Sequence, residues 1–398
     1  MRVSLTNKLV SLPTSRPDCL SFEHFADFRR TLTQIPPAYS LRFSLIAKLA
    51  SILNLPPNAP VLESCGRIRN SRDFPDIADA APGAVKPHLF RNLTGHCDYI
   101  YSVAMSEDGK KAISSCWDGS VKIWEVETGR NLRTYTHQFC STLCVVFCPG
   151  DKWAVSAGGN SFMHRLDCPW TPDRAVHVWD VETGTKQHTL MGHRTTVTAV
   201  DVSSDGFMIA SASGDKTIKL WDKNTGENKA TLRGHSSTVT TVVFHPDGEM
   251  LASGSTDCTI KLWNVSTEHP MRTLDKKHNE AVTQVVFTPD GQRLASSSMD
   301  KSIIVWDLRS GEEIISFTEH TDCVISLAMF PNGLRIVSGS DDKTVRIWNL
   351  LSGTLEHTLS GHKHSVTSVA VSRDGKTLVS GSWDKTVKVW ELRNARRG

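Results

Sequence analysis

The sequence predicts an all-β fold built from seven repeats, and three observations support this prediction. Tryptophans recur with 55, 42, 42, 43, 42 and 42 residues between successive members, which are Trp124, Trp179, Trp221, Trp263, Trp306, Trp348 and Trp390. An aspartate stands six residues before each tryptophan, at Asp118, Asp173, Asp215, Asp257, Asp300, Asp342 and Asp384. A histidine stands 22 residues before six of these aspartates, at His96, His193, His235, His278, His320 and His362. Self-similarity at such a fixed period indicates a repeat architecture.

One repeat, "GHSSTVTTVVFHPDGEMLASGSTDCTIKLWN" (residues 234–264), shows the local pattern. "TVTTVVF" and "MLASGS" are short, rich in β-branched or small residues, and joined by "HPDG", a typical turn sequence. "TIKLWN" alternates as a third strand, and the segment before the next histidine supplies a fourth. Four strands per repeat without a helical period predict a single seven-bladed β-propeller of four-stranded antiparallel blades over residues 84–394.

The motifs from Gly234-His235 to Trp263-Asn264 resemble the WD-repeat family, and the resemblance covers roughly residues 84–394. In that family a histidine, a serine, an aspartate and a tryptophan form a hydrogen-bonded structural tetrad. A buried aspartate needs such donors, because an unpaired charge inside a blade is costly. The resemblance therefore implies structural roles for His96, Ser114, Asp118, Trp124, His193, Ser211, Asp215, Trp221, His235, Ser253, Asp257, Trp263, His278, Ser296, Asp300, Trp306, His320, Ser338, Asp342, Trp348, His362, Ser380, Asp384 and Trp390.

The seventh repeat stops just after its third strand, so its fourth strand must come from elsewhere. The segment "KPHLFRNLTGH", which ends at His96, places Leu93 three residues before the histidine, as Leu232 stands before His235. This N-terminal segment can complete the last blade and pair its open edge. Such closure is usual in the WD-repeat family, and we expect it here.

Residues 1–83 differ in composition from the repeats. The first 90 residues hold ten of the 17 prolines, two of the 26 glycines and none of the 11 tryptophans. Segments 21–34 and 40–55 carry apolar residues at helical spacing between Pro-rich breaks. We expect a partly helical or disordered extension, which either docks on the propeller or forms a partner-binding helix pair. Residues 395–398 form a short basic tail.

Charge and composition bound the function. The first 90 residues carry 11 Lys+Arg against 7 Asp+Glu, so the propeller is nearly neutral in a chain of net charge +3. A near-neutral propeller argues against bulk nucleic-acid binding. No apolar segment is long enough to span a membrane. Ten scattered cysteines without a secretory signal favour a cytoplasmic or nuclear protein, with organelle import as a weaker alternative because the first 17 residues are basic.

No cofactor and no metal ion are expected. Cys140, Cys144 and Cys148 would be spread too far along a strand for one ion. His164 and Cys168 have no second ligand pair. The chain also lacks a non-repeated constellation of acid, base and nucleophile, so we do not expect an enzyme.

The recognition surface is expected on the face where the histidine loop and the aspartate turn of each blade meet, which in WD-repeat proteins is the usual peptide-binding face. Large aromatic residues stand there only in some repeats: two tryptophans directly precede the aspartates of repeats seven and one, two tyrosines flank Ile100, and another tryptophan lies in an insert of repeat two, residues 161–172. We predict that these residues form one partly exposed patch that binds peptide segments of partner proteins: Tyr99, Tyr101, Trp117, Trp170 and Trp383. In the alternative, they only stabilise neighbouring loops.

The endings "WDLR" (residues 306–309) and "WELR" (residues 390–393) give a second hypothesis. Residues 294–309 and 378–393 resemble the W-D-x-R box of WD-repeat substrate receptors in cullin–RING ubiquitin ligases. This resemblance implies adaptor contacts by Asp307, Arg309, Glu391 and Arg393. The leading interpretation remains a non-enzymatic intracellular scaffold with a monomeric ring, and the ligase receptor is the alternative.

Overall fold

The computed structural model describes residues 85–136, 141–159, 174–275 and 277–394. Every regular element within these ranges is a β-strand, and the strands form seven antiparallel four-stranded sheets. The fold class predicted from the repeats is thereby confirmed. The N-terminal extension 1–83, the insert 161–172 with Trp170 and the tail 395–398 lie outside the described residues.

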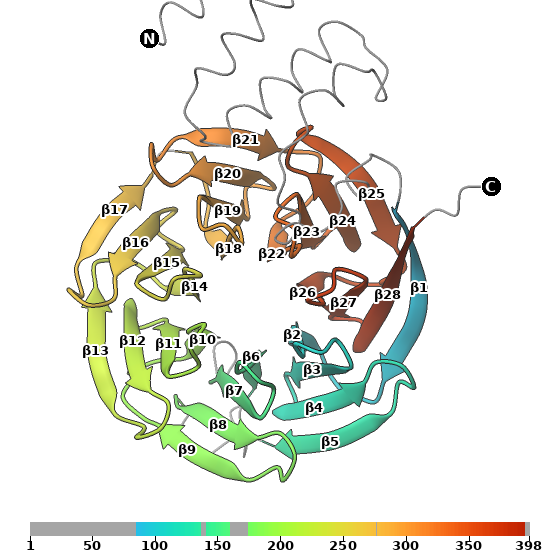
Figure 1. Cartoon of the computed structure of the whole chain (residues 1–398), viewed down its shortest axis with the longest axis horizontal. Helices are drawn as coiled ribbons and strands as arrows, with labels where there is room; N and C mark the ends of the chain where they lie inside the picture. Colours follow the sequence, from blue (N-terminus) through green and yellow to red (C-terminus); the bar gives the residue numbers. More distant parts are fainter. Residues whose placement is uncertain (1–84, 137–140, 160–173, 276, 395–398) are drawn as a thin grey trace, which may run out of the picture. The chain divides into compact units, whose positions relative to one another are not determined.

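The sheets succeed one another around a ring, and we number them as blades one to seven (Figure 1). Blade one comprises β2 (Ile100–Met105), β3 (Lys111–Cys116), β4 (Ser120–Glu125) and β5 (Asn131–Thr136). Blade two comprises β6 (Thr142–Phe147), β7 (Trp153–Gly158), β8 (Val176–Asp180) and β9 (Lys186–Leu190). Blade three comprises β10 (Val197–Val202), β11 (Met208–Ser213), β12 (Thr217–Asp222) and β13 (Asn228–Arg233). Blades four and five comprise β14 (Val239–Phe244), β15 (Met250–Ser255), β16 (Ile260–Asn264) and β17 (Pro270–Leu274); β18 (Val282–Phe287), β19 (Arg293–Ser298), β20 (Ile303–Asp307) and β21 (Glu313–Phe317). Blade six comprises β22 (Val324–Met329), β23 (Arg335–Ser340), β24 (Thr344–Asn349) and β25 (Thr354–Ser360).

Blade seven joins the two ends of the described chain. Its sheet order is β26 (Val366–Val371), β27 (Thr377–Ser382), β28 (Thr386–Asn394) and then β1 (Val85–Thr94). The pairing runs antiparallel from Val85 opposite Asn394 to Thr94 opposite Thr386, with a register shift at Phe90. The N-terminal strand therefore closes the ring as the outermost strand of the last blade, as Figure 1 shows.

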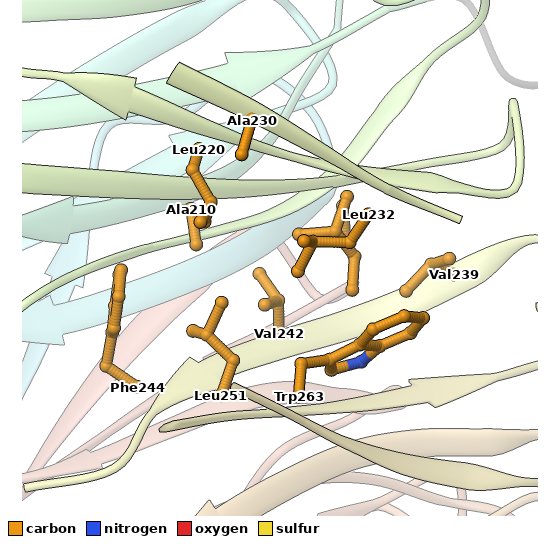
Figure 2. Close-up of a cluster of buried hydrophobic side chains, with 11 residues drawn as sticks. Ala210, Leu220, Ala230, Leu232, Val239, Val242, Phe244, Leu251 and Trp263 are labelled. Carbon is orange, nitrogen blue, oxygen red and sulfur yellow. The ribbon is translucent and has the colours of Figure 1, made fainter. Parts of the chain in front are cut away.

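The core lies between successive blades. Leu220 and Leu232 of blade three pack in one cluster with Val242, Phe244 and Trp263 of blade four (Figure 2). Trp263 is only 1% exposed. Burying each side chain of this size contributes about 2–3 kcal/mol relative to leaving it exposed. Because every cluster takes side chains from neighbouring blades, no blade buries its apolar faces alone.

The turn between the second and third strands of a blade is fixed by its aspartate. In blade three, Asp215 Oδ1 accepts the Thr217 N–H at 3.0 Å, and the intervening Lys216 adopts a left-handed φ of 68°. Such side-chain bonding two residues on stabilises a tight turn. The residue before the aspartate is consequently held at the same edge of every blade that repeats this turn.

Among the residues that the structure describes, no helix has the length and apolar character needed to cross a membrane.

Candidate partner-binding face

The predicted tetrads connect the loops of blades three to seven to their strands. The histidine Nδ1 lies 2.7–2.9 Å from the aspartate Oδ2 in all five blades. The histidine Nε2 lies 2.7–2.8 Å from the serine Oγ. The tryptophan Nε1 donates to that same Oγ at 2.8–2.9 Å. The loop before each blade is thereby tied to the turn between its second and third strands.

Electrostatics strengthen this connection. Burial alone would raise the pKa of Asp257, but hydrogen bonds from Thr259 and His235 outweigh burial and lower that pKa to about 2. Asp215, Asp300, Asp342 and Asp384 shift in the same direction for the same kind of reason. Both nitrogens of each tetrad histidine are engaged in these blades, so these residues hold the loops rather than offering a free general base.

Blade one departs from the expected tetrad. His96 Nε2 lies 2.7 Å from Ser114 Oγ, and Trp124 donates to the same hydroxyl at 2.8 Å. However, His96 Nδ1 lies 3.0 Å from Ser120 Oγ instead of bonding to Asp118. The side chain of Asp118 is exposed, and its carboxylate accepts the backbone N–H groups of Ser120 and Cys97. The assignment of Asp118 as the partner of His96 is therefore wrong for this blade.

Cys116 is a local difference in the turn that shows this departure. In blades three to seven a serine two residues before the aspartate accepts its backbone N–H at 3.0–3.1 Å, and these serines are Ser213, Ser255, Ser298, Ser340 and Ser382. Sulfur is larger than oxygen and a weaker acceptor, so the Cys116 thiol holds the Asp118 N–H less firmly than a serine hydroxyl would. Burial, together with the charge of Asp118, raises the pKa of Cys116 to about 12.

Blade two can be compared only in part. Trp179 Nε1 donates to Ser156 Oγ at 2.7 Å, as in the other blades. Asp173 of this repeat lies outside the described residues, and so does His137, the histidine that stands 36 residues before it.

Four of the five predicted partner-binding aromatics lie together at the junction of blades seven and one. Tyr99 packs on Trp383 with ring centroids 5.5 Å apart, and Tyr101 packs on Trp117 at 5.7 Å. The backbone N–H of Trp117 donates to the backbone carbonyl of Tyr99 at 2.9 Å, and this hydrogen bond connects the two pairs. We call Tyr99, Tyr101, Trp117 and Trp383 the aromatic strip.

The aromatic strip is accessible on what we call the loop face, the side that carries the histidine loops and the aspartate turns. Tyr99 is 41% exposed, and the other three residues are half-buried. Burial and the neighbouring charge of Asp98 raise the pKa of Tyr101 to about 12. The Nε1 of Trp383 is buried and has no hydrogen-bond partner among the described residues. This indole therefore adds no polar contact that would stabilise its turn.

The two boxes of the ligase hypothesis lie in different blades. Asp307 accepts the Ser310 N–H at 2.7 Å and so holds its own turn. Glu391 pairs with His88 at 3.3 Å across the closing strand. Arg309 is exposed on blade five, whereas Arg393 pairs by register with Lys86 in blade seven. The structure thus gives Asp307 and Glu391 structural contacts and separates the two arginines by one intervening blade.

Several carboxylates near the aromatic strip were missed by sequence reasoning, namely Asp98, Asp322 and Asp341, together with the exposed state of Asp118. Their signals are readable from the repeat alignment. Cys116 stands where five other repeats have serine, and Asp341 occupies the position of Trp117 and Trp383. A repeat-by-repeat comparison could have found these differences, but not which charges they expose.

Comparisons with known proteins agree with the fold. The family model described as "WD domain, G-beta repeat" matches residues 88–125 and 353–391, and the model described as "TEP-1 second beta-propeller" matches residues 163–356. Similar proteins include small ribosomal subunit protein RACK1y of Oryza sativa subsp. japonica, 28% identical over 34% of this chain and 52% of the relative. WD repeat-containing protein SL1-17 of Schistosoma mansoni is 33% identical over 30% of this chain and 50% of the relative.

A third relative, transcription initiation factor TFIID subunit 5 of Caenorhabditis elegans, is 30% identical over 30% of this chain and 22% of the relative. The chain spans about half of the length of the first two curated relatives and less of the third. Repeat motifs, seven closed blades and matching family models lead to one conclusion: the chain belongs to the WD-repeat β-propeller family.

Proposed function

We propose that this protein is a non-enzymatic scaffold that binds peptide segments of partner proteins on its loop face, through the aromatic strip. The observation that supports the proposal is the pair of ring contacts, Tyr99 with Trp383 and Tyr101 with Trp117, at an accessible junction of two blades. Grouped aromatic side chains on a surface commonly mark interaction sites. Tyrosine and tryptophan also dominate binding energy when a partner covers them.

The scaffold below the aromatic strip supports the same proposal. The tetrads of blades three to seven and the strand β1 hold the loops at fixed positions, so a partner meets a preorganised surface. Two of the relatives carry names of components of larger assemblies, a small ribosomal subunit protein and a TFIID subunit. Partner binding at a rigid ring is compatible with such a role.

The ligase-receptor alternative rests on the motif resemblance alone. Asp307 and Glu391 are engaged with Ser310 and His88, and the two arginines belong to different blades. We therefore propose the loop-face function and not adaptor binding.

Affinity purification with the full chain tests the proposal. Proteins retained by the unmodified chain are expected to be lost from a Trp117→Ala/Trp383→Ala variant that melts like the unmodified protein. The matched control is Phe207→Ala, which removes a side chain 58% exposed at the β10–β11 turn, on the opposite side from the loop face. Equal retention by all three proteins would exclude the aromatic strip as the partner site.

A further inference from the structure

Carboxylates flank the aromatic strip on the blade-one side. Asp118 directly follows Trp117 and is exposed, and the nitrogen of His96 that was expected to bond it bonds to Ser120 instead. Asp98 directly precedes Tyr99 and accepts its backbone N–H at 2.9 Å. Lys385 Nζ lies 3.9 Å from Asp98 and donates to the Cys97 carbonyl at 2.8 Å, so it partly neutralises Asp98. Of the two carboxylates on this side, Asp118 is therefore the one whose negative charge is more available to a ligand.

A second acidic group lies at the blade-six end of the strip. Asp341 occupies the turn position that Trp383 holds in the next blade. Its carboxylate bonds to the side chain of Ser365, and the backbone carbonyl of Ser365 accepts the backbone N–H of Trp383 at 3.1 Å. The side-chain oxygens of Asp322 and Asp341 and the thiol of Cys323 lie within 4.8 Å of one another. The aromatic strip thus lies between two pairs of aspartates, Asp98 with Asp118 on one side and Asp322 with Asp341 on the other.

The carboxylates around the aromatic strip have few basic partners within the described chain. Among the described residues, no lysine or arginine forms an ion pair with Asp118, Asp322 or Asp341 through a side-chain nitrogen. Lys301 Nζ lies beside Asp322, where it donates to the Thr321 carbonyl at 2.9 Å, so Asp118 and Asp341 are the carboxylates with the least counter-charge. Burial and the neighbouring charges of Asp322 and Asp342 raise the pKa of Asp341. A cation placed beside these carboxylates would relieve the repulsion among them.

Lysine and arginine side chains match both features of the surface. Their alkyl stems cover apolar rings while the charged head remains near carboxylates. Their cations are also attracted to the faces of tryptophan and tyrosine, and more strongly when desolvated by a partner. An acidic or purely apolar segment would satisfy the rings but leave the carboxylates without counter-charge.

We propose, on the basis of the proposed function, that the segment bound at the aromatic strip is basic. One lysine or arginine lies on Tyr101 and Trp117 with its charge at Asp118, and a second basic residue meets Asp322 and Asp341 beyond Trp383. The segment crosses the junction of blades seven and one and takes its affinity from ring contacts and its selectivity from the carboxylates.

A random displayed peptide library selected on the full chain tests this proposal. Selected peptides are expected to be enriched in lysine and arginine, and to bind less tightly as salt is raised. Asp118→Asn should weaken them about tenfold, since a hydrogen-bonded charge pair is lost. The matched control is Glu280→Gln, since Glu280 is exposed and stands two residues after His278, as Asp98 stands two residues after His96. This control should leave affinity unchanged.

A second pair of changes, Asp322→Asn with Asp341→Asn, keeps the test decisive if Asp118→Asn alters the fold. Peptides that need Trp117 and Trp383 but show no basic enrichment and ignore the aspartate changes would overturn the inference and leave the proposed function standing. Peptides that bind equally to the Trp117→Ala/Trp383→Ala variant, or a library that yields no binder, would overturn both.

Discussion

His96 in blade one bonds to the hydroxyl of Ser120, with 3.0 Å between Nδ1 and Oγ, whereas five other blades place a carboxylate at that nitrogen. Burial lowers the pKa of His96 to about 4, and the nearby charge of Asp118 only partly opposes this effect. The Asp118 side chain does not bond to His96 and is exposed on the surface beside Trp117. A structural departure within one tetrad therefore contributes charge to the candidate site.

Replacing Cys116→Ser is expected to restore the regular tetrad. A serine would accept the Asp118 N–H as Ser213 accepts that of Asp215, and Asp118 would then reach His96. The pKa of His96 should rise from about 4, because the carboxylate favours the charged imidazole. The free energy of unfolding should increase by about 1 kcal/mol for the added hydrogen bond. Histidine NMR titration and urea unfolding measure the two effects; an unchanged His96 titration would contradict this account of Cys116.

Closure of the ring depends on apolar burial beneath β1. Leu93 is 1% exposed and packs with Trp124 and Val387, whereas Leu89 on the same strand is 44% exposed. Leu93→Ala should lower the free energy of unfolding by about 2–5 kcal/mol, and Leu89→Ala should change it by less than about 0.5 kcal/mol. Chemical denaturation provides the comparison.

Truncation tests the same closure on a larger scale. Deleting residues 84–95 removes β1 and should cause aggregation or a clear fall in melting temperature, because the edge of β28 is exposed. Deleting residues 1–80 should have a much milder effect. Equal damage from the two truncations would show that β1 does not close the ring.

Asp201 lies at the contact of blades three and four, and it should make the free energy of unfolding depend on pH. It is half-buried on β10 and accepts the Phe244 N–H at 2.7 Å, and burial raises its pKa from 3.8 to about 6. The folded state therefore favours the protonated acid. This contribution is fully present below about pH 3.8 and is lost as pH rises through about 6. Asp201→Asn should remove the decline and leave the protein more stable at neutral pH, as measured by urea unfolding across this range.

Asp205→Asn serves as the opposite control for Asp201. Asp205 is exposed, and hydrogen bonds from the Phe207 N–H and the Ser203 hydroxyl lower its pKa. Its contribution is therefore present above the ordinary aspartate pKa and is lost in acid. The Asn variant should be less stable at neutral pH than the unmodified protein. The same sign for both variants would contradict the assigned burial of Asp201.

The two tryptophans of the aromatic strip should differ in stability effect from those of the tetrads. Trp117→Ala with Trp383→Ala removes half-buried side chains and should shift the free energy of unfolding by no more than about 1 kcal/mol. Trp263→Ala removes a side chain 1% exposed and bonded to Ser253, and should cost about 3–5 kcal/mol. Melting curves distinguish the two results. A large loss in the double variant would favour a purely structural role for the strip.

The double change in the aromatic strip, which should have little effect on stability, should have a large effect on partner binding. The Trp117→Ala/Trp383→Ala variant is expected to lose about 2 kcal/mol or more of partner affinity, since buried aromatics dominate interface energy. Calorimetry with a selected peptide measures this loss.

The repeat number, the four strands of each blade and the closure by residues before His96 can all be predicted from the amino-acid sequence. These features follow from local periodicity and turn chemistry, which are repeated so often that no tertiary contact is needed to read them. The aromatic residues of the site were also visible, because Trp117 and Trp383 stand where the repeats of blades three to six have Gly214, Thr256, Met299 and Asp341, none of them aromatic.

The way in which those residues combine depends on three-dimensional packing. The contact of Tyr99 with Trp383 joins residues from opposite ends of the propeller sequence, and it exists because β1 closes the ring and makes blades seven and one neighbours. The exposure of Asp118 likewise could not be read from the repeat pattern, since it depends on which hydrogen bond His96 makes in the folded blade. A repeat motif specifies which groups are available, but the balance of hydrogen-bond geometry and burial at each turn decides which of them reach the surface.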